Sequence, residues 1–110
     1  MSEVTSIGRL RVPPKAKRGE VIEIRLLLQH PMENGFRRDT LGRSVPRNII
    51  HRLTARYDGR EILRAELGTG MAANPYFAFF TRATASGEVV IEWEDDLGLK
   101  GRLAAPSEVS

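Results

Sequence analysis

The sequence predicts an all-β domain, a β-sandwich of about seven antiparallel strands. Three observations lead to this prediction. Apolar residues alternate with polar ones at a period of two in most segments, which is typical of half-buried strands. Turn signals separate these segments, among them Asp58-Gly59 and Asp96-Leu97-Gly98. No segment shows a sustained helical period, so at most one short helical turn is expected, within 66–73.

The first strands are recognised from their alternation. Residues 9–12 alternate, and Pro13-Pro14 ends this segment as proline does in an edge strand. A turn at 17–20 leads into a strand over 21–29. After a long polar loop, a further strand runs over 49–57. The residues predicted to face the core are Ile22, Ile24, Leu26 and Leu28 in one strand, and Ile49, His51, Leu53 and Ala55 in the other.

Two registers fit the hairpin at Asp58-Gly59. A two-residue turn sets Leu53 opposite Arg64, which puts apolar and charged residues on one face. A three-residue loop with Gly59 in the left-handed region avoids this conflict and is the predicted register. Its pairs are Leu53 with Leu63, Ile49 with Leu67, and His51 with Ala65.

The last hairpin is predicted by the same argument. Residues 89–94 alternate, and a loop at Asp96-Leu97-Gly98 sets Ile91 opposite Leu103 and Trp93 opposite Gly101. Seven short strands joined by turns are typical of an immunoglobulin-like sandwich. The chain has no cysteine, so it lacks the disulfide of antibody domains. Such a fold hosts many functions and does not by itself indicate one.

Length and composition set further bounds. The 110 residues, 41% of them hydrophobic and 28% charged, are typical of one globular domain, with 1–6 and 106–110 expected to be flexible ends. No apolar run approaches the ~20 residues that span a bilayer, so no membrane association is expected. The N-terminal segment lacks the pattern of a signal peptide, which taken alone indicates the cytoplasm.

The basic composition does not indicate nucleic-acid binding. The net charge is +3 and the pI is about 9.8, but only residues 15–18 form a tight basic cluster. The other arginines are spaced like strand or loop surface, which is typically solvated or faces an acidic protein. We therefore expect no nucleic-acid partner.

No group of residues predicts catalysis, a cofactor or a metal. The two histidines, His30 and His51, have no second ligand at metal spacing. His51 is expected to be a hydrogen-bonded residue at the edge of the core, and His30 to order the loop that follows it. Asp95-Asp96 opens a tight turn, where aspartate caps backbone amides, instead of forming a glycosidase-like pair. The serines lack a nucleophile elbow, and Gly68-Thr69-Gly70 is not a phosphate loop. The sequence predicts a protein that is not an enzyme.

The segment 74–80, NPYFAFF, has apolar residues on both faces of its predicted strand. Phe77 and Phe79 are expected to fill the core, and Tyr76, Ala78 and Phe80 to point outward. A sandwich strand normally has a polar outer face, so something is expected to cover this one. The long loop of this chain and another subunit both remain open, and aromatic residues favour the subunit.

The loop between His30 and Ile50 is unusually long for a compact domain, in which such loops are functional or disordered. It combines an exposed Met32, Phe36 and several arginines, a composition that suits an adaptable contact surface. A mobile solvated loop is the alternative. The four arginines are Arg37, Arg38, Arg43 and Arg47.

Several motifs resemble the SoxZ family of bacterial thiosulfate-oxidising systems. They are His30-Pro31-Met32-Glu33-Asn34-Gly35, Arg37-Arg38-Asp39, Pro46-Arg47-Asn48-Ile49-Ile50, and Ala73-Asn74-Pro75-Tyr76 with Phe79-Phe80. The resemblance extends from residue 11 to residue 96, and the ends of the chain add nothing to it.

The resemblance implies an immunoglobulin-like, non-catalytic subunit that pairs with SoxY as a heterodimer in the periplasm. SoxY carries the sulfur substrate on a cysteine of a flexible arm and presents it to the Sox enzymes, which the subunit helps to dock. Export with the partner, whose twin-arginine signal serves both chains, then replaces a signal peptide. Whether the isolated chain forms a homodimer stays open.

Which residues touch the partner does not follow from the motifs. The candidate interface residues are His30, Pro31, Met32, Gly35, Phe36, Arg37, Arg38, Arg43, Pro46, Arg47, Asn74, Pro75, Tyr76 and Phe80. The alternative function is a stand-alone module that recognises an acidic partner through the arginines of the loop.

Overall fold

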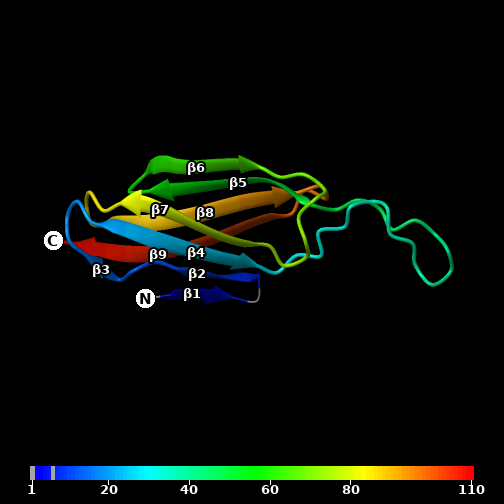
Figure 1. Ribbon diagram of the computed structural model, residues 1–110, viewed down its shortest axis with the longest axis horizontal. Coiled ribbons are helices and arrows are strands. Elements are labelled where there is room, and N and C mark those ends of the chain that lie inside the picture. Colours follow the sequence, from blue (N-terminus) through cyan, green and yellow to red (C-terminus); the bar gives the residue numbers. More distant parts are fainter. Residues whose placement is uncertain (1, 6) are drawn as a thin grey trace.

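Two sheets make up the computed structural model, which describes residues 2–5 and 7–110 (Figure 1). The first sheet has the order β1-β2-β4-β7, with β1 (Ser2–Thr5), β2 (Gly8–Arg11), β4 (Val21–Leu28) and β7 (Tyr76–Arg82). The second has the order β3-β9-β8-β5-β6, with β3 (Lys15–Ala16), β5 (Ile50–Tyr57), β6 (Arg60–Glu66), β8 (Gly87–Asp95) and β9 (Lys100–Val109). The predicted all-β, immunoglobulin-like sandwich is confirmed. The structure adds two short strands, β1 and β3, to the seven expected.

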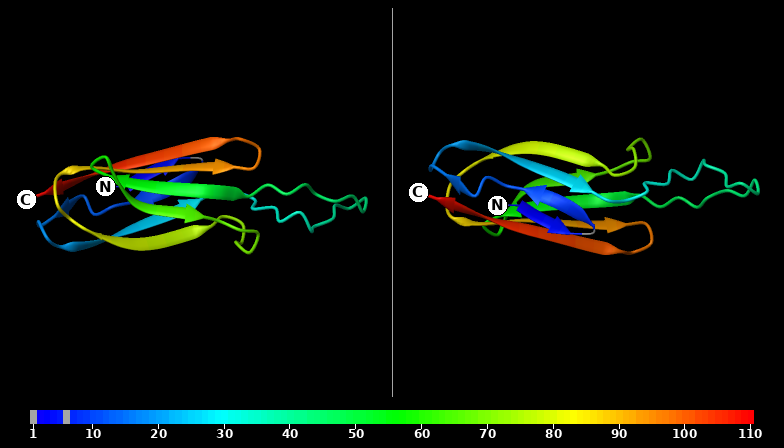
Figure 2. Two further views of the ribbon diagram at one scale, coloured as in Figure 1. Left: turned by 90° about the horizontal axis from the view of Figure 1, so that it is seen from above. Right: turned by 90° about the horizontal axis from the view of Figure 1, so that it is seen from below.

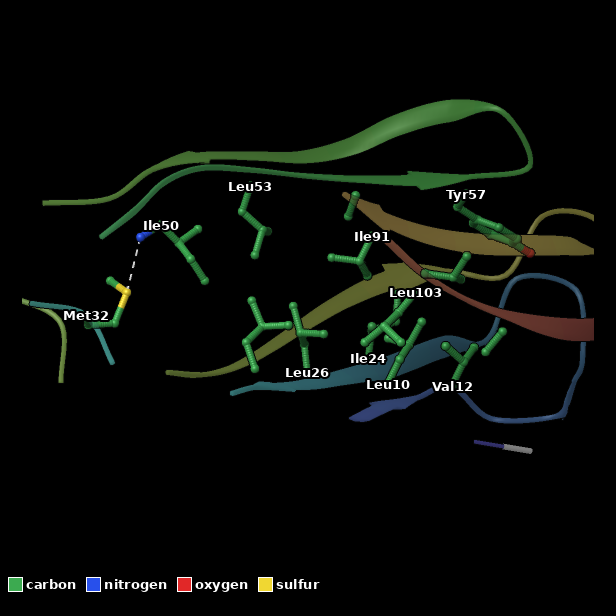
Figure 3. Packing of buried hydrophobic residues seen from close by; sticks show 14 of the residues in the cluster. Leu10, Val12, Ile24, Leu26, Met32, Ile50, Leu53, Tyr57, Ile91 and Leu103 are labelled. Carbon is green, nitrogen blue, oxygen red and sulfur yellow. Dashed lines mark hydrogen bonds between the residues drawn. The ribbon is translucent and has the colours of Figure 1, made fainter. Parts of the chain in front are cut away.

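The core lies between the two sheets, and the alternation in the sequence assigns most of it correctly (Figure 3). The inward face of β4 is buried as predicted, from Ile22 to Leu28. Ile24, Leu26 and Leu28 belong to one buried cluster with Leu53, Ile91 and Leu103 of the opposite sheet. Burying one such side chain contributes roughly 1.5–3 kcal/mol, so this face holds the two sheets together.

The register predicted for the β8–β9 hairpin is confirmed. Ile91 pairs with Leu103 and Trp93 pairs with Gly101, while Gly98 in the turn has a φ of 82°. A Cβ atom on residue 101 would lie 2.1 Å from the Trp93 ring. The indole therefore covers the backbone of a residue that has to be glycine.

The predicted register of the β5–β6 hairpin is wrong. Asp58 and Gly59 form a two-residue turn with φ values of 50° and 80°, and Tyr57 pairs with Arg60. Two positive φ angles match the twist of a hairpin, which favours this turn. A bulge that leaves Ile62 unpaired then shifts the register, so Leu53 pairs with Ala65. The bulge, and not the turn, keeps the apolar residues on one face.

A second irregularity moves His51 out of the core, contrary to the prediction. The pairing of β5 with β8 shifts between Ile50 and Arg52. Ile49 and Ile50 are therefore both buried, although they are neighbours in the sequence. The His51 side chain is 37% exposed and lies 3.4 Å from a carboxylate oxygen of Glu94.

The ends of the chain also differ from the expectation. β2 is not an edge strand, because β1 pairs with it on its outer side; Met1 and Ser6 lie outside the described residues. Residues 106–109 continue β9, and the buried Ser107 donates a hydrogen bond to the Pro13 carbonyl at 2.8 Å. Backbone hydrogen bonds also connect Ser110 to Ala16 and Arg18. Residues 2–5 and 106–109, which were expected to be flexible, are thus parts of strands.

Helices are absent from residues 2–5 and 7–110, including 66–73, where a helical turn was expected. It follows that these ranges hold no helix long and apolar enough to span a bilayer.

Candidate partner-binding surfaces

The outward side chains of β7 form an exposed surface, here called the aromatic face: Tyr76, Ala78 and Phe80. Tyr76 is 56% exposed and Phe80 is 65% exposed. Phe77 and Phe79, which alternate with them, pack against the core. The predicted division of this strand is confirmed, because its apolar residues do face both ways.

Strand β4 widens the aromatic face and adds charge beside it. Leu27, which is 41% exposed, pairs with Tyr76. Arg25 pairs with Ala78 and forms an ion pair of 2.6 Å with Glu23. This hydrogen-bonded ion pair raises the pKa of Arg25 above its usual range. The next strand, β2, adds Arg9 and Arg11 on the same outer face.

The long loop forms a projecting arm, here called the extension (residues 31–48). It leaves the sandwich at the end opposite the C-terminus and accounts for the long 58 Å dimension of the molecule (Figures 1 and 2). Two isolated β-bridges join its limbs, Glu33 with Asn48 and Arg38 with Ser44. Because the extension points away, it leaves Tyr76 and Phe80 exposed. The open possibility that this loop covers the aromatic face is therefore wrong.

Each arginine of the extension already has a partner within the chain. Arg37 binds Glu33 at 2.7 Å, and Arg43 binds Asp39 at 3.1 Å. Arg47 binds Asp96 of the β8–β9 turn at 2.8 Å, and Arg38 donates to the Gly42 carbonyl at 2.9 Å. These guanidinium groups brace the extension, which removes the main support for the alternative of an acidic partner bound through them.

The carboxylates of these pairs titrate below their usual range. The hydrogen bond from Arg37 lowers the pKa of Glu33, and the one from Arg47 lowers the pKa of Asp96. For Asp39 the main cause of the lowered pKa is the hydrogen bond from the Arg43 amide. All three groups are ionised at neutral pH, so these pairs are formed there.

We expect the extension to loosen in acid before the sandwich does. A carboxylate with a lowered folded-state pKa contributes stability above its unfolded pKa of about 4, and this is lost as the pH falls through the folded pKa. NMR titration should show the Leu41 and Arg43 amide signals moving below pH ~4. Asp39→Asn retains the acceptor oxygen and should remove this movement. Carboxyl groups that titrate at ordinary values would contradict the prediction.

Met32 is buried, contrary to the prediction that it is exposed. Only 5% of it is accessible, and its sulfur accepts the Ile50 amide at 3.3 Å (Figure 3). Its φ of 48° turns the side chain back into the core at the base of the extension. The exposed apolar residues of the extension are Phe36, at 82%, and Leu41, at 73%. Sequence reasoning missed Leu41, which lies in a polar stretch without periodicity.

His30 is buried at the base of the extension and holds three segments together. Its Nε2 donates to Oδ2 of the buried Asp95 at 3.1 Å, and its Nδ1 accepts the Met32 amide at 3.0 Å. Its backbone amide donates to the Asn74 side chain, and the Asn74 amide donates back to the His30 carbonyl. The prediction that His30 orders the loop fits these contacts. Nothing in the sequence near His30 indicates its contact with Asp95, which lies 65 positions later.

Among the remaining candidate interface residues, Pro31 and Pro46 are exposed on the extension. Gly35 has a φ of 88°, and a Cβ atom placed on it would lie 3.3 Å from the Cβ atom of Arg47. Pro75 is buried, and its carbonyl accepts the Leu28 amide. The structure therefore divides the candidates into a buried group at the base (His30, Met32 and Pro75), with the exposed Asn74 hydrogen-bonded to it, and a group that is exposed or half-buried.

Asp95 caps the turn that it opens, as expected, whereas the Asp96 carboxylate binds residues outside this turn. Oδ1 of Asp95 accepts the amides of Leu97 and Leu99, and Oδ2 of Asp96 accepts the amide of Ile49. Within residues 2–5 and 7–110, no group of three or more His, Cys, Asp or Glu side chains is placed to hold a metal ion. What the described surface does offer is apolar contact area, on the aromatic face and on the extension.

Comparison with known proteins identifies the family and the fold. A family model described as sulphur oxidation protein SoxZ matches residues 10–105, which is most of the chain. The search of curated protein sequences gives no match.

Solved structures share the fold at low sequence identity. The E23A variant of superoxide reductase (neelaredoxin) from Ignicoccus hospitalis gives a TM-score of 0.74 at 16% identity, over 94% of this chain and 80% of that chain. A putative superoxide reductase from Thermotoga maritima gives 0.70 at 14% identity, over 94% and 85%. The sulfur carrier protein SoxY from Chlorobium limicola gives 0.66 at 9% identity, over 96% and 81%. At identities this low, the comparison shows a shared fold alone and says nothing about activity.

Proposed function

The chain belongs to the SoxZ family of sulphur oxidation proteins, and on this premise we propose that it is the non-catalytic subunit of a SoxYZ-type carrier of sulfur compounds. Its partner is a SoxY-type subunit, which carries the sulfur substrate on a cysteine in the pattern of the family. This division of work agrees with the composition, because the chain has no cysteine and cannot hold the substrate as a thiol adduct.

The observation that supports pairing is the aromatic face. Two large aromatic side chains, Tyr76 and Phe80, are more than half exposed, and Tyr76 pairs with the exposed Leu27. Aromatic residues are enriched at the centres of protein interfaces, where they form anchors of the binding energy. A SoxY-type subunit seated here buries side chains that the chain does not cover itself.

The extension supports a second contact, with the Sox enzymes that act on the carried sulfur. Its hydrogen bonds and ion pairs hold it in one shape, and a preorganised loop loses less entropy on binding than a mobile one. Phe36 and Leu41 are the exposed apolar side chains that it presents. We place the complex in the periplasm through export with the partner, and cell fractionation with and without the partner's export signal tests this placement.

Co-expression with the SoxY-type subunit tests the proposed function. We expect a 1:1 heterodimer in sedimentation velocity, formed also from the two separately folded chains. A variant of the partner with its cysteine replaced by serine should bind equally well, because pairing uses this chain's apolar surface and not the reactive sulfur. If both chains are folded and no complex forms, the proposed function is wrong.

A further inference from the structure

Strand β7 is an unprotected edge of its sheet. Proteins usually protect such edges with charges, bulges, prolines or short strands, because an open edge pairs with other chains. Edge strand β6 of the other sheet has charges at four of its seven positions and a bulge at Ile62, and edge strand β3 is two residues long. By contrast, β7 has seven residues, a continuous register and one charge, on Arg82.

The backbone groups that point away from the sheet can be assigned by residue. The Leu28 amide donates to the Pro75 carbonyl, and Ala83 exchanges hydrogen bonds with Gly19 and Glu20. Hydrogen-bonded and non-bonded positions alternate along an antiparallel pair, so Phe77, Phe79 and Thr81 also bond to β4. The amides and carbonyls of residues 76, 78, 80 and 82 then point to the open edge. The side chains of residues 76, 78 and 80 make up the aromatic face, and that of Arg82 lies at the end of it.

The charge around this edge indicates the kind of partner. On the outer face formed by β2, β4 and β7, the described charged side chains are Arg9, Arg11, Arg25, Arg82 and Glu23. Four arginines against one glutamate would repel an identical face. A partner with apolar residues at its centre and acidic residues around them fits this face better than a second copy does.

We propose that the open edge of β7 pairs with an extended strand of the SoxY-type subunit, whose apolar side chains cover Tyr76 and Phe80 and whose acidic residues face the arginines. This inference rests on the proposed function and specifies its binding mode, strand addition across β7. Main-chain hydrogen bonds then provide affinity, and the aromatic and charged side chains provide specificity. The continuous sheet would remove the edge that the chain leaves open.

Amide hydrogen exchange of the complex, measured residue by residue, tests this mode. In the free chain, the amides of Tyr76, Ala78, Phe80 and Arg82 should exchange rapidly, and those of Phe77, Phe79 and Thr81 slowly. In the complex, the first set should become protected by about 100-fold or more, because these amides gain hydrogen bonds that open only with the complex. Protection of alternate residues distinguishes strand addition from simple covering of the face.

A pair of substitutions at Ala78 provides the matched test. Ala78→Pro removes one amide that points to the edge and breaks no hydrogen bond to β4, a position where an edge strand tolerates proline. It should weaken the heterodimer by about 10- to 100-fold, because a buried acceptor of the partner loses its donor. Ala78→Thr retains the amide, so the affinity of the heterodimer should stay within about 3-fold of the parent. This change is smaller than the one expected from the loss of the hydrogen bond.

The outcomes separate the two proposals. If the heterodimer forms and the four outward amides remain unprotected, strand addition is wrong and the proposed function stands. If the amides become protected in the isolated chain as it dimerises, and the partner does not displace that dimer, the occupant is a second copy. Equal affinities of Ala78→Pro and Ala78→Thr would also overturn the inference. If no heterodimer forms, the proposed function itself fails.

Discussion

Replacing both Tyr76 and Phe80 by alanine is expected to weaken binding of the SoxY-type subunit by about 100-fold or more. Buried aromatic anchors at interfaces commonly contribute 2 kcal/mol or more each, and about 2.7 kcal/mol corresponds to 100-fold in affinity. Because both side chains are largely exposed in the single chain, the free energy of unfolding should change by only about 0.5 kcal/mol. Calorimetric titration and urea unfolding measure the two quantities.

Phe77→Ala is the matched control on the same strand. Phe77 packs against the core, so its truncation should cost about 3 kcal/mol of stability and change affinity little in the folded fraction. A loss of affinity in the double variant and a loss of stability in Phe77→Ala would confirm the division of β7 into two faces. If the Tyr76 and Phe80 variant binds as tightly as the parent, the partner does not use this surface.

Replacing Asp95 by alanine is expected to destabilise the chain by about 3–5 kcal/mol. This buried carboxylate accepts hydrogen bonds from the His30 ring and from the amides of Leu97 and Leu99. Removing it leaves these donors without a partner, and a buried donor left unsatisfied costs about 1–3 kcal/mol. The His30 ring would also lose its anchor, so the Met32 amide should exchange faster. Urea unfolding and amide exchange measure both effects.

Two further variants sharpen this test. Asp96→Ala removes the neighbouring aspartate of the same turn and breaks the exposed pair with Arg47, which should cost clearly less stability than Asp95→Ala because solvent screens this pair. Asp95→Asn retains one acceptor oxygen for the turn but sets an NH2 group against the His30 Nε2 proton, so an intermediate loss is expected. If Asp95→Ala costs no more than Asp96→Ala, the contact with His30 is not a structural support.

The register of one hairpin could be predicted from the sequence and that of the other could not. At Asp96-Leu97-Gly98, the best apolar match and the loop geometry agree, and Trp93 does pair with Gly101. At Asp58-Gly59, the same argument rejected the two-residue turn that the structure contains. A bulge restores the match three residues later, and a bulge is placed by contacts across the sheet and not by the residues around it.

For the candidate surfaces, too, one part could be predicted from the sequence and another part could not. The two faces of β7 follow from alternation within seven residues, and the structure has them as predicted. The environment of the extension was not predictable in the same way. Met32 looks like an exposed contact residue within a polar loop, but its backbone turns it into the core beside Ile50. The arginines look like a binding surface, but three of them form ion pairs with carboxylates of the chain.

Four properties could be predicted from the sequence alone: the fold class, the inward residues of most strands, the two faces of β7 and the family. These properties depend on a period of two, on turn residues and on motifs, all of which are local in the chain. Two arrangements become visible only in the folded chain: the extension points away from the aromatic face, and β7 ends its sheet with an open edge. The contact between His30 and Asp95 is a third such arrangement. Each of these arrangements joins residues distant in sequence, and their placement depends on how the two sheets pack as a whole.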